Sequence, residues 1–264
     1  MHPVLFTLPL FGTQLDIPTY GILLALAFLI VLKVAAHLAR QERLDPRDVL
    51  DLCFVVFLAG LVGAKLLLIL LDLPYYLSNP RALASTIRSA GVFYGGLLTA
   101  IPVGIWYVRR RALPLWKVAD ILGICLPIGS AFGRMGCLAA GCCYGKPSHL
   151  PWAIIFTSEK AQQTTGIPLN VPLHPTQIYL SLNALFLTAI LFWIRRRKRY
   201  DGQVFLWFIV LYGGTRSFWE IFRGDAVRGF LVPDLISTSQ AIGMVSVLAG
   251  LGIMMWRRHA ARPS

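Results

Sequence analysis

Charged residues are scarce in this sequence. Only 14% of its 264 residues are charged and 56% are hydrophobic, whereas an ordinary soluble domain carries about a quarter charged residues. Among the charged residues, acidic ones are the scarcer: the chain has 12 Asp and Glu but 25 Lys and Arg, which gives a net charge of +13. This composition, with a mean hydropathy of +0.66, argues against a water-soluble fold and favours a membrane protein.

Other features that are missing narrow the choice. No internal repeat or low-complexity tract is evident, so we expect one membrane-embedded domain over residues 1–264. Residues 1–16 contain no Lys or Arg, whereas a cleavable signal peptide begins with a basic stretch, so we expect the first apolar stretch to be retained. The basic residues form short runs at the ends of apolar stretches, which argues against a nucleic-acid partner.

The long apolar stretches predict membrane-spanning helices. A helix rises 1.5 Å per residue, so about 20 mostly apolar residues are needed to cross a hydrocarbon core of about 30 Å. The sequence therefore predicts an all-α polytopic membrane protein with about seven spans. The expected spans are Ile17 to His37, Val49 to Leu71, Gly91 to Val108, Val118 to Met135, Gln177 to Ile194, Gln203 to Phe222 and Ile236 to Trp256.

Basic residues in alternate connections predict the orientation, because cytoplasmic loops accumulate Lys and Arg. One side carries Arg40, Arg43, Arg47, Arg109, Arg110, Arg111, Lys117, Arg195, Arg196, Arg197, Lys198, Arg199, Arg257, Arg258 and Arg262. The other side carries fewer than half as many, namely Arg81, Arg88, Lys146, Lys160, Arg223 and Arg228. We therefore expect the N-terminus outside and the C-terminus in the cytoplasm.

With this orientation, the polar residues of five spans fall at one depth. Tyr20 begins the first span, Lys65 lies in the outer half of the second, and Tyr94 opens the third. Arg134 closes the fourth span, and Arg216 lies near the end of the sixth. The connection 136–176, which contains His174, also lies outside and is long enough to fold over a site. We expect a functional site at the extracytoplasmic face, since ionisable residues within spans are rare and often functional.

Arg216, Glu220 and Arg223 share one helix face, because residues three and four apart are neighbours on a helix. Glu220 can pair with either arginine. One interpretation is an ion pair that only fixes helix packing; the other is a site for a phosphate-bearing partner, since the guanidinium fork matches phosphate geometry. The gathering of polar residues from five spans favours a site, and a phospholipid headgroup is the nearest such ligand.

The segment Gly133 to Gly145 is the most unusual in the chain, with glycines at 133, 136, 141 and 145. We expect these glycines to break the helix and to bring backbone N–H groups close to a ligand. Cys137, Cys142 and Cys143 could bind a metal, form a disulfide or pack as small buried residues. Because the sequence places no fourth ligand, we expect no metal site.

Six stretches resemble the bacterial prolipoprotein diacylglyceryl transferase family, and together they cover nearly the whole chain. They are Tyr20-Gly21, Gly63-Ala64-Lys65, Phe93-Tyr94-Gly95-Gly96-Leu97, the Gly133 to Gly145 segment, His174-Pro175-Thr176-Gln177-Ile178-Tyr179, and Arg216-Ser217-Phe218-Trp219-Glu220-Ile221-Phe222-Arg223-Gly224-Asp225.

The resemblance implies an enzyme of the bacterial cytoplasmic membrane whose site faces the periplasm. Its partners would be phosphatidylglycerol and prolipoprotein signal peptides that end in a lipobox cysteine. The reaction would move a diacylglyceryl group from the lipid to the cysteine thiol, forming a thioether and releasing glycerol phosphate. No cofactor is implied. Such a displacement requires groups that bind the phosphate, stabilise its growing charge and help deprotonate the thiol.

The resemblance also implies roles for individual residues. Arg134 matches the family's phosphatidylglycerol-binding arginine and Arg216 its second essential arginine, which Glu220 would hold in place. With Tyr94 these form the expected catalytic set. The residues expected to bind phosphatidylglycerol are Arg134, Tyr20, Gly95, Gly96, Gly145, His174, Lys65 and Arg223.

This chain departs from the family's pattern at the expected base. The family typically has His-Gly-Gly where this chain has Tyr94-Gly95-Gly96, and a Tyr of pKa about 10 is a poor base unless nearby cations lower its pKa. Cys137 and Cys142 replace a common Asn and Glu, and Leu180 replaces a common Glu. Either Tyr94 or the cations alone would then assist the thiol.

Two other functions fit part of the pattern. A homologue without catalytic activity would bind phospholipid or signal peptide, and the missing His motivates that alternative. A transporter would also tolerate Arg and Glu within spans, but it should show charges throughout the membrane depth or repeats with broken helices near the midplane. The sequence shows neither of these.

Overall fold

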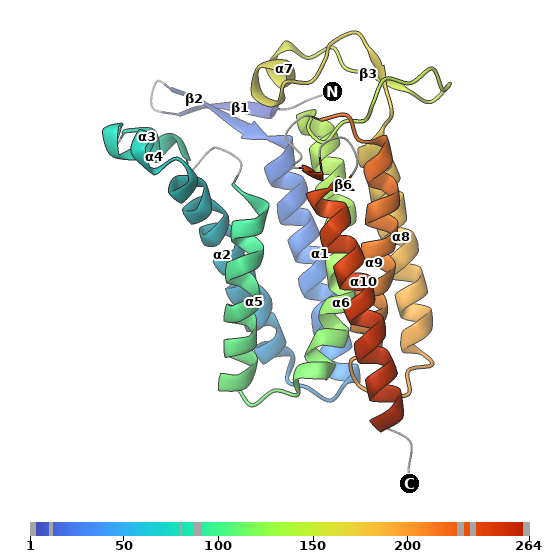
Figure 1. The fold of residues 1–264 in the computed structure, drawn as a ribbon. Coiled ribbons are helices and arrows are strands. Elements are labelled where there is room, and N and C mark those ends of the chain that lie inside the picture. Colours follow the sequence, from blue (N-terminus) through green and yellow to red (C-terminus); the bar gives the residue numbers. More distant parts are fainter. Residues whose placement is uncertain are drawn as a thin grey trace. The chain divides into compact units, whose positions relative to one another are not determined.

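The computed structural model describes residues 4–10, 13–79, 81–86, 91–225, 230–232 and 236–260, and these are mostly helical (Figure 1). Each expected span corresponds to a helix. These helices are α1 (Thr19–Gln41), α2 (Pro46–Leu71), α5 (Phe93–Arg110), α6 (Leu115–Ala140), α8 (Thr176–Arg195), α9 (Gln203–Trp219) and α10 (Thr238–Ala260). Arg88, Arg228 and Arg262, which entered the charge count, lie outside the described residues.

Five helices in the described part of the chain are long and apolar enough to cross a membrane: α1, α2, α6, α8 and α10. Helix α9 has only 17 residues, and the arginines at the end of α5 lower its hydropathy. The expected all-α polytopic membrane fold is thus confirmed, while a count of seven spans is not. Large apolar side chains such as Leu248, which is 70% exposed, lie on the helix surfaces, as expected for a protein that faces lipid.

The chain divides into two compact units. The first comprises Met1–Val34 and Ala119–Ser264. In it, the hydroxyl of Ser181 on α8 donates to the carbonyl of Ala131 on α6, at 3.0 Å. Helices α9 and α10 approach closely at Gly213 and Gly243, where a Cβ on Gly213 would lie 2.9 Å from the carbonyl oxygen of Gly243. Small residues allow such contacts between membrane helices.

A buried carboxylate fixes the far end of this unit. Asp120 near the start of α6 is 1% exposed. It accepts backbone hydrogen bonds from Gly202 and Phe205, both at 3.0 Å, at the start of α9. Lys198 lies 3.4 Å from the same carboxylate. A buried charge is tolerated when it is paired and hydrogen-bonded, as Asp120 is.

The second unit, Ala35–Val118, contains α2 and α5 with the short helices α3 (Leu73–Ser78) and α4 (Arg81–Thr86). Helices α2 and α5 pack through glycines: a Cβ on Gly95 would lie 2.4 Å from the carbonyl oxygen of Gly63. The hydroxyl of Thr99 donates to the carbonyl of Ala59 across the same contact, at 2.8 Å. Glycine at both positions is therefore what lets the two helix backbones touch.

The remaining elements are short, and all lie in the first unit. They are β1 (Val4–Leu10), β2 (Thr13–Pro18), β3 (Ile154–Ile155), α7 (Glu159–Thr165), β4 (Pro172–Leu173), the 3₁₀ turn η1 (Glu220–Phe222), β5 (Phe230–Val232) and β6 (Ile236–Ser237). Within the connection 136–176, Phe156, Ala161, Ile167 and Leu173 form a small apolar core. This connection is therefore a folded cap with its own core.

The helix breaks within Gly133 to Gly145, as expected, but late in that segment. Helix α6 continues through Gly133 and Gly136 to Ala140, five residues beyond the expected end of the span at Met135. Gly136 is helical and contacts the ring of Tyr20, whose nearest atom would lie 2.8 Å from a Cβ there. The break comes at Gly141, whose φ of +78° is a left-handed conformation that glycine adopts readily. Within this segment, glycine serves helix packing first and helix termination second.

Candidate active site

The site is built on backbone pairing that joins three parts of the first unit. Gly145 donates to the carbonyl of His174 at 3.2 Å, and His174 donates to the carbonyl of Lys146 at 3.0 Å. On the other side of this segment, Lys146 donates to Phe222 at 2.9 Å, and Gly224 donates to Tyr144 at 3.0 Å. The turn after α6 thus lies between the start of α8 and the end of α9, and it holds their residues in register.

This pairing requires glycine at two positions. A Cβ on Gly145 would lie 2.5 Å from both the carbonyl oxygen and the Cβ of His174. A Cβ on Gly224 would lie 2.6 Å from the carbonyl oxygen of Gly145. Real side chains do not approach backbone atoms this closely, so any larger residue would push the three segments apart.

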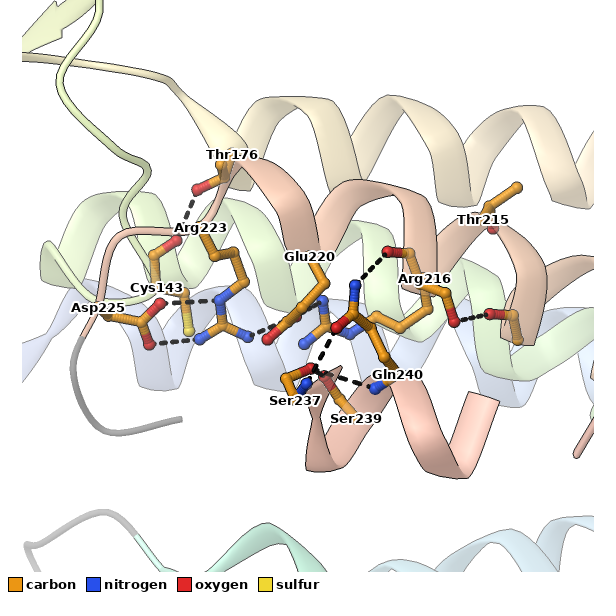
Figure 2. A network of polar contacts seen from close by, with 12 residues as sticks. Cys143, Thr176, Thr215, Arg216, Glu220, Arg223, Asp225, Ser237, Ser239 and Gln240 are labelled. Atoms are coloured by element: carbon orange, nitrogen blue, oxygen red, sulfur yellow. Dashed lines mark hydrogen bonds and ion pairs between the residues drawn. The ribbon is translucent and has the colours of Figure 1, made fainter. Parts of the chain in front are cut away.

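A buried chain of charges follows α9 and η1 (Figure 2). Arg216 forms an ion pair with Glu220, and Arg223 lies 3.9 Å from the same carboxylate. Arg223 also binds Asp225 through two nitrogens, with Nε to Oδ1 at 2.8 Å. Glu220 is 2% exposed. The predicted pairing of Glu220 with either arginine is confirmed for both.

Burial alone would lower the pKa of Arg223, but its hydrogen bonds with Asp225 and its attraction to Cys143, Asp225 and Glu220 together raise the pKa above the ordinary value. Arg223 therefore stays charged although it is 9% exposed. A two-nitrogen arginine pair of this kind also fixes the plane of the guanidinium group. The network presents oriented positive charge in a largely buried setting.

Arg134 is bound differently from the other two arginines. It lies on α6 and interacts electrostatically with Arg216, with Arg223 and with the thiols of Cys137 and Cys143. Among the described residues, no carboxylate or carbonyl forms a hydrogen bond or ion pair with its guanidinium group. Within the described part of the chain, its donors are therefore available for an anion.

Three cysteines lie beside these cations. The sulfur atoms of Cys137, Cys142 and Cys143 are all within 4.8 Å of one another. The thiol of Cys142 donates to the carbonyl of Cys137 at 3.7 Å. The thiols of Cys137 and Cys142, together with the nearby Arg134 and Arg223, lower the pKa of Cys143 below its ordinary value. The sequence left open whether these cysteines are a metal site, a disulfide or packing residues; all three are free thiols here.

Tyr20 and His174 line the same end of the unit. The ring of Tyr20 packs on Gly136. The Nδ1 atom of His174 lies 3.3 Å from the hydroxyl of Tyr179, and its ring contacts that of Phe222 at a centroid distance of 5.4 Å. His174 is thus held by aromatic neighbours and by its backbone pairing with residues 145 and 146.

Four of the expected site residues belong to the second unit. Lys65 on α2 donates to the carbonyl of Thr86 at 2.7 Å. Tyr94 lies in the first turn of α5, is 39% exposed, and contacts Phe93 edge to face. Gly95 and Gly96 pack against α2, where a Cβ on Gly96 would lie 2.9 Å from the carbonyl oxygen of Gly60. The structure therefore gives both glycines a packing role, and their expected contact with lipid stays a prediction.

Several residues of the site were not among those predicted. Asp225 completes the charge network, and Thr176 and Gln177 hold the cysteine turn through hydrogen bonds to the carbonyls of Cys143 and Cys142, at 2.7 and 2.8 Å. Gln240 on α10 donates to the carbonyl of Ser217 at 3.4 Å (Figure 2). Asp225, Thr176 and Gln177 lie inside the motifs that resemble the family, and this position could have identified them as site residues. No feature of the sequence points to Gln240.

Comparison with known proteins decides the family. The family model described as prolipoprotein diacylglyceryl transferase matches residues 3–256. The chain belongs to this family. Similar curated proteins named phosphatidylglycerol–prolipoprotein diacylglyceryl transferase occur in Clostridium tetani, 32% identical over 95% of this chain and 96% of the relative, and in Bordetella avium, 31% identical over 94% of each. A third, from Paracidovorax citrulli, is 34% identical over 86% of this chain and 83% of the relative.

Family membership confirms the resemblance drawn from the six stretches, and it agrees with the apolar helices of the structure. The protein is a multi-pass membrane protein of a transferase family. The roles expected for Arg134, Arg216, Glu220 and Tyr94 stay predictions, and so does the significance of Tyr94 at the position of the usual histidine.

Proposed function

We propose that this protein transfers a diacylglyceryl group from phosphatidylglycerol to the thiol of a lipobox cysteine in a prolipoprotein. The sulfur forms a new bond to the glycerol carbon, and the bond from that carbon to the phosphate oxygen breaks. Glycerol phosphate leaves with the bonding electron pair, and the thiol proton passes to a base. The reaction takes place at the periplasmic face of the bacterial cytoplasmic membrane.

The observation that carries this proposal is the contrast among three clustered arginines. Arg216 and Arg223 are held by Glu220 and Asp225, whereas Arg134 has no such partner among the described residues. A phosphate group between Arg134 and Arg216 would meet charged donors that need no rearrangement. Positive charge fixed in a largely buried site stabilises charge that grows on a leaving phosphate, and one such donor contributes about 10²- to 10³-fold in rate.

Of the other residues, one orients an arginine and the rest are expected to contact the substrate. Glu220 is a positioning residue that orients Arg216. Tyr20, Lys65, Gly95, Gly96, Gly145, His174 and Arg223 form the expected phosphatidylglycerol-binding set. The hydroxyl of Tyr94 accepts the thiol proton; the cations alone are the competing explanation, since they favour the thiolate of the substrate.

The test is transfer by the purified protein in detergent with phosphatidylglycerol whose acyl chains are labelled. One arm contains a lipobox peptide, and a matched arm contains the same peptide with its cysteine replaced by serine. A third arm replaces phosphatidylglycerol by phosphatidylethanolamine with the same chains. We expect labelled thioether product only with phosphatidylglycerol and the cysteine peptide.

Binding is measured beside transfer, because it separates an enzyme from a homologue that only binds lipid or signal peptide. Phosphatidylglycerol binding without any labelled peptide, in protein that unfolds cooperatively on heating, would contradict the proposed transferase and support the binding homologue.

A further inference from the structure

The three cysteines of the glycine-rich segment converge on one point. Cys137 lies in the last turn of α6, and Cys142 and Cys143 lie in the turn after it. Their sulfur atoms are within 4.8 Å of one another, and among the described residues no His, Asp or Glu belongs to the same group. The proposed transfer reaction uses none of these three thiols.

The backbone around these cysteines is held in an uncommon conformation. Cys143 has a φ of +59°, a left-handed conformation that residues other than glycine adopt rarely and that costs about 1 to 2 kcal/mol. Two side chains at the start of α8 fix it: the hydroxyl of Thr176 donates to the carbonyl of Cys143, and the amide of Gln177 donates to that of Cys142. Both donors are at most 1% exposed.

This arrangement differs from that of the remaining cysteines. Cys53 and Cys125 are buried within helices, 6% and 2% exposed, as small packing residues are. Cys137, Cys142 and Cys143 are only partly buried, so an ion can reach them. A strained turn pinned by buried hydrogen bonds, with three accessible sulfurs facing one another, is a built site rather than a packing contact.

We propose that Cys137, Cys142 and Cys143 bind one thiophilic metal ion, Cu(I) or Zn(II), through three sulfurs. Three sulfurs in a plane at about 2.3 Å from a metal lie about 4 Å apart, which the observed limit of 4.8 Å accommodates. Thiolate ligands select these ions over Mg²⁺ or Ca²⁺. The thiol protons leave to water on binding, and Arg134 and Arg223 offset the charge of the resulting thiolates.

The test uses the full chain in detergent, reduced, freed of reductant without oxygen, and counted to contain five free thiols. Cu(I) alone, and Zn(II) alone in a second arm, are titrated against a chromogenic chelator. We expect one ion per chain with at least one of the two metals, accompanied by ultraviolet charge-transfer absorption from sulfur. Cys142→Ser and Cys143→Ser should weaken binding by more than the roughly 10- to 100-fold that loss of an outer partner of a metal site costs.

Cys53→Ala is the matched control, because Cys53 lies on α2 in the other unit, and its binding should equal that of the wild type. Thermal unfolding of each variant shows that it is folded. Absence of stoichiometric binding of either metal by folded wild type would overturn the site, as would undiminished binding by the variant that lacks all three cysteines. A disulfide from Cys137 to Cys142 or Cys143 in protein taken from membranes without reductant would also overturn it. The readout is independent of transferase activity.

Discussion

Tyr94 stands where the resemblance to the family leads us to expect a histidine. If its hydroxyl accepts the thiol proton, Tyr94→Phe should lower the transfer rate by about 100-fold or more, the usual contribution of a general base. Tyr94→His should retain activity. The rate is measured with labelled phosphatidylglycerol and the lipobox peptide across a pH series.

Tyr75→Phe is the control for this pair of variants, since Tyr75 is 50% exposed on α3 and its ring contacts that of Tyr76 edge to face. It should transfer at the wild-type rate. If Tyr94→Phe does so too, the arginines alone assist the thiol and Tyr94 has no part in proton transfer.

Residue spacing predicted part of the site. The separation of four residues between Arg216 and Glu220 was enough to predict their ion pair, because that spacing places both on one helix face. The pairing of Arg223 with Asp225 could not be predicted, since Asp225 follows the helix and no periodicity fixes its direction. Among the described residues, the lack of a hydrogen-bond or ion-pair partner for Arg134 depends on neighbours that are distant in sequence, so sequence alone could not reveal it.

At the scale of elements, the end of α9 depends on a buried charge. Glu220→Gln leaves Arg216 and Arg223 without the carboxylate between them, and breaking a buried ion pair costs about 3 kcal/mol. We expect a clear fall in the unfolding temperature in detergent. Asp48→Asn removes an exposed ion pair with Arg111, 3.7 Å long, which is worth less than about 1 kcal/mol. Equal unfolding temperatures for the two variants would refute the structural role of Glu220.

The joint between α6, α8 and α9 depends on Gly145. Gly145→Ala would place a Cβ 2.5 Å from His174, and such overpacking costs about 1 to 3 kcal/mol. Gly133→Ala is the matched variant, because a Cβ at Gly133 meets nothing within 4 Å and alanine favours a helix by up to about 1 kcal/mol. Unfolding in detergent should show the first variant destabilised and the second unchanged or stabilised. The reverse order would contradict the close backbone contact.

The positions of helices could be predicted where hydropathy determines them, and less well where contacts between side chains and backbone determine them. The apolar stretches located the seven long helices of the described residues, because spanning a membrane demands long apolar runs. The end of α6 was misplaced because four glycines suggested an early break, whereas packing of Tyr20 on Gly136 keeps that part helical. Glycine content in membrane helices thus reports close packing as readily as termination.

At the scale of the whole molecule, the distribution of Lys and Arg predicts the orientation. Alkaline phosphatase, active only outside the cytoplasm, should be active when inserted at Asn170 in the cap and inactive when inserted between Arg196 and Gly202. An active enzyme at the second position would reverse the orientation and place the arginine cluster on the cytoplasmic side.

Composition and the six stretches predicted the membrane class and the family. They could not predict the two compact units, because the division depends on which helices contact one another, and apolar helix surfaces look alike in sequence. The sequence also could not predict the cluster of three thiols. Spacing places Cys137 near Cys142, but only the turn at Gly141 and Cys143 brings the three sulfurs together.

The most direct test of the account is the transfer rate of Arg134→Ala from phosphatidylglycerol to the lipobox peptide, with Arg199→Ala as the control. Arg199 lies in the loop between α8 and α9, outside the cluster. If Arg134 binds the phosphate of the lipid, its loss should lower kcat/KM by about 10²- to 10³-fold, while Arg199→Ala keeps the wild-type value. Equal rates for both variants, each folded as judged by thermal unfolding, would contradict the assignment of Arg134 to the phosphate and the proposed mechanism with it.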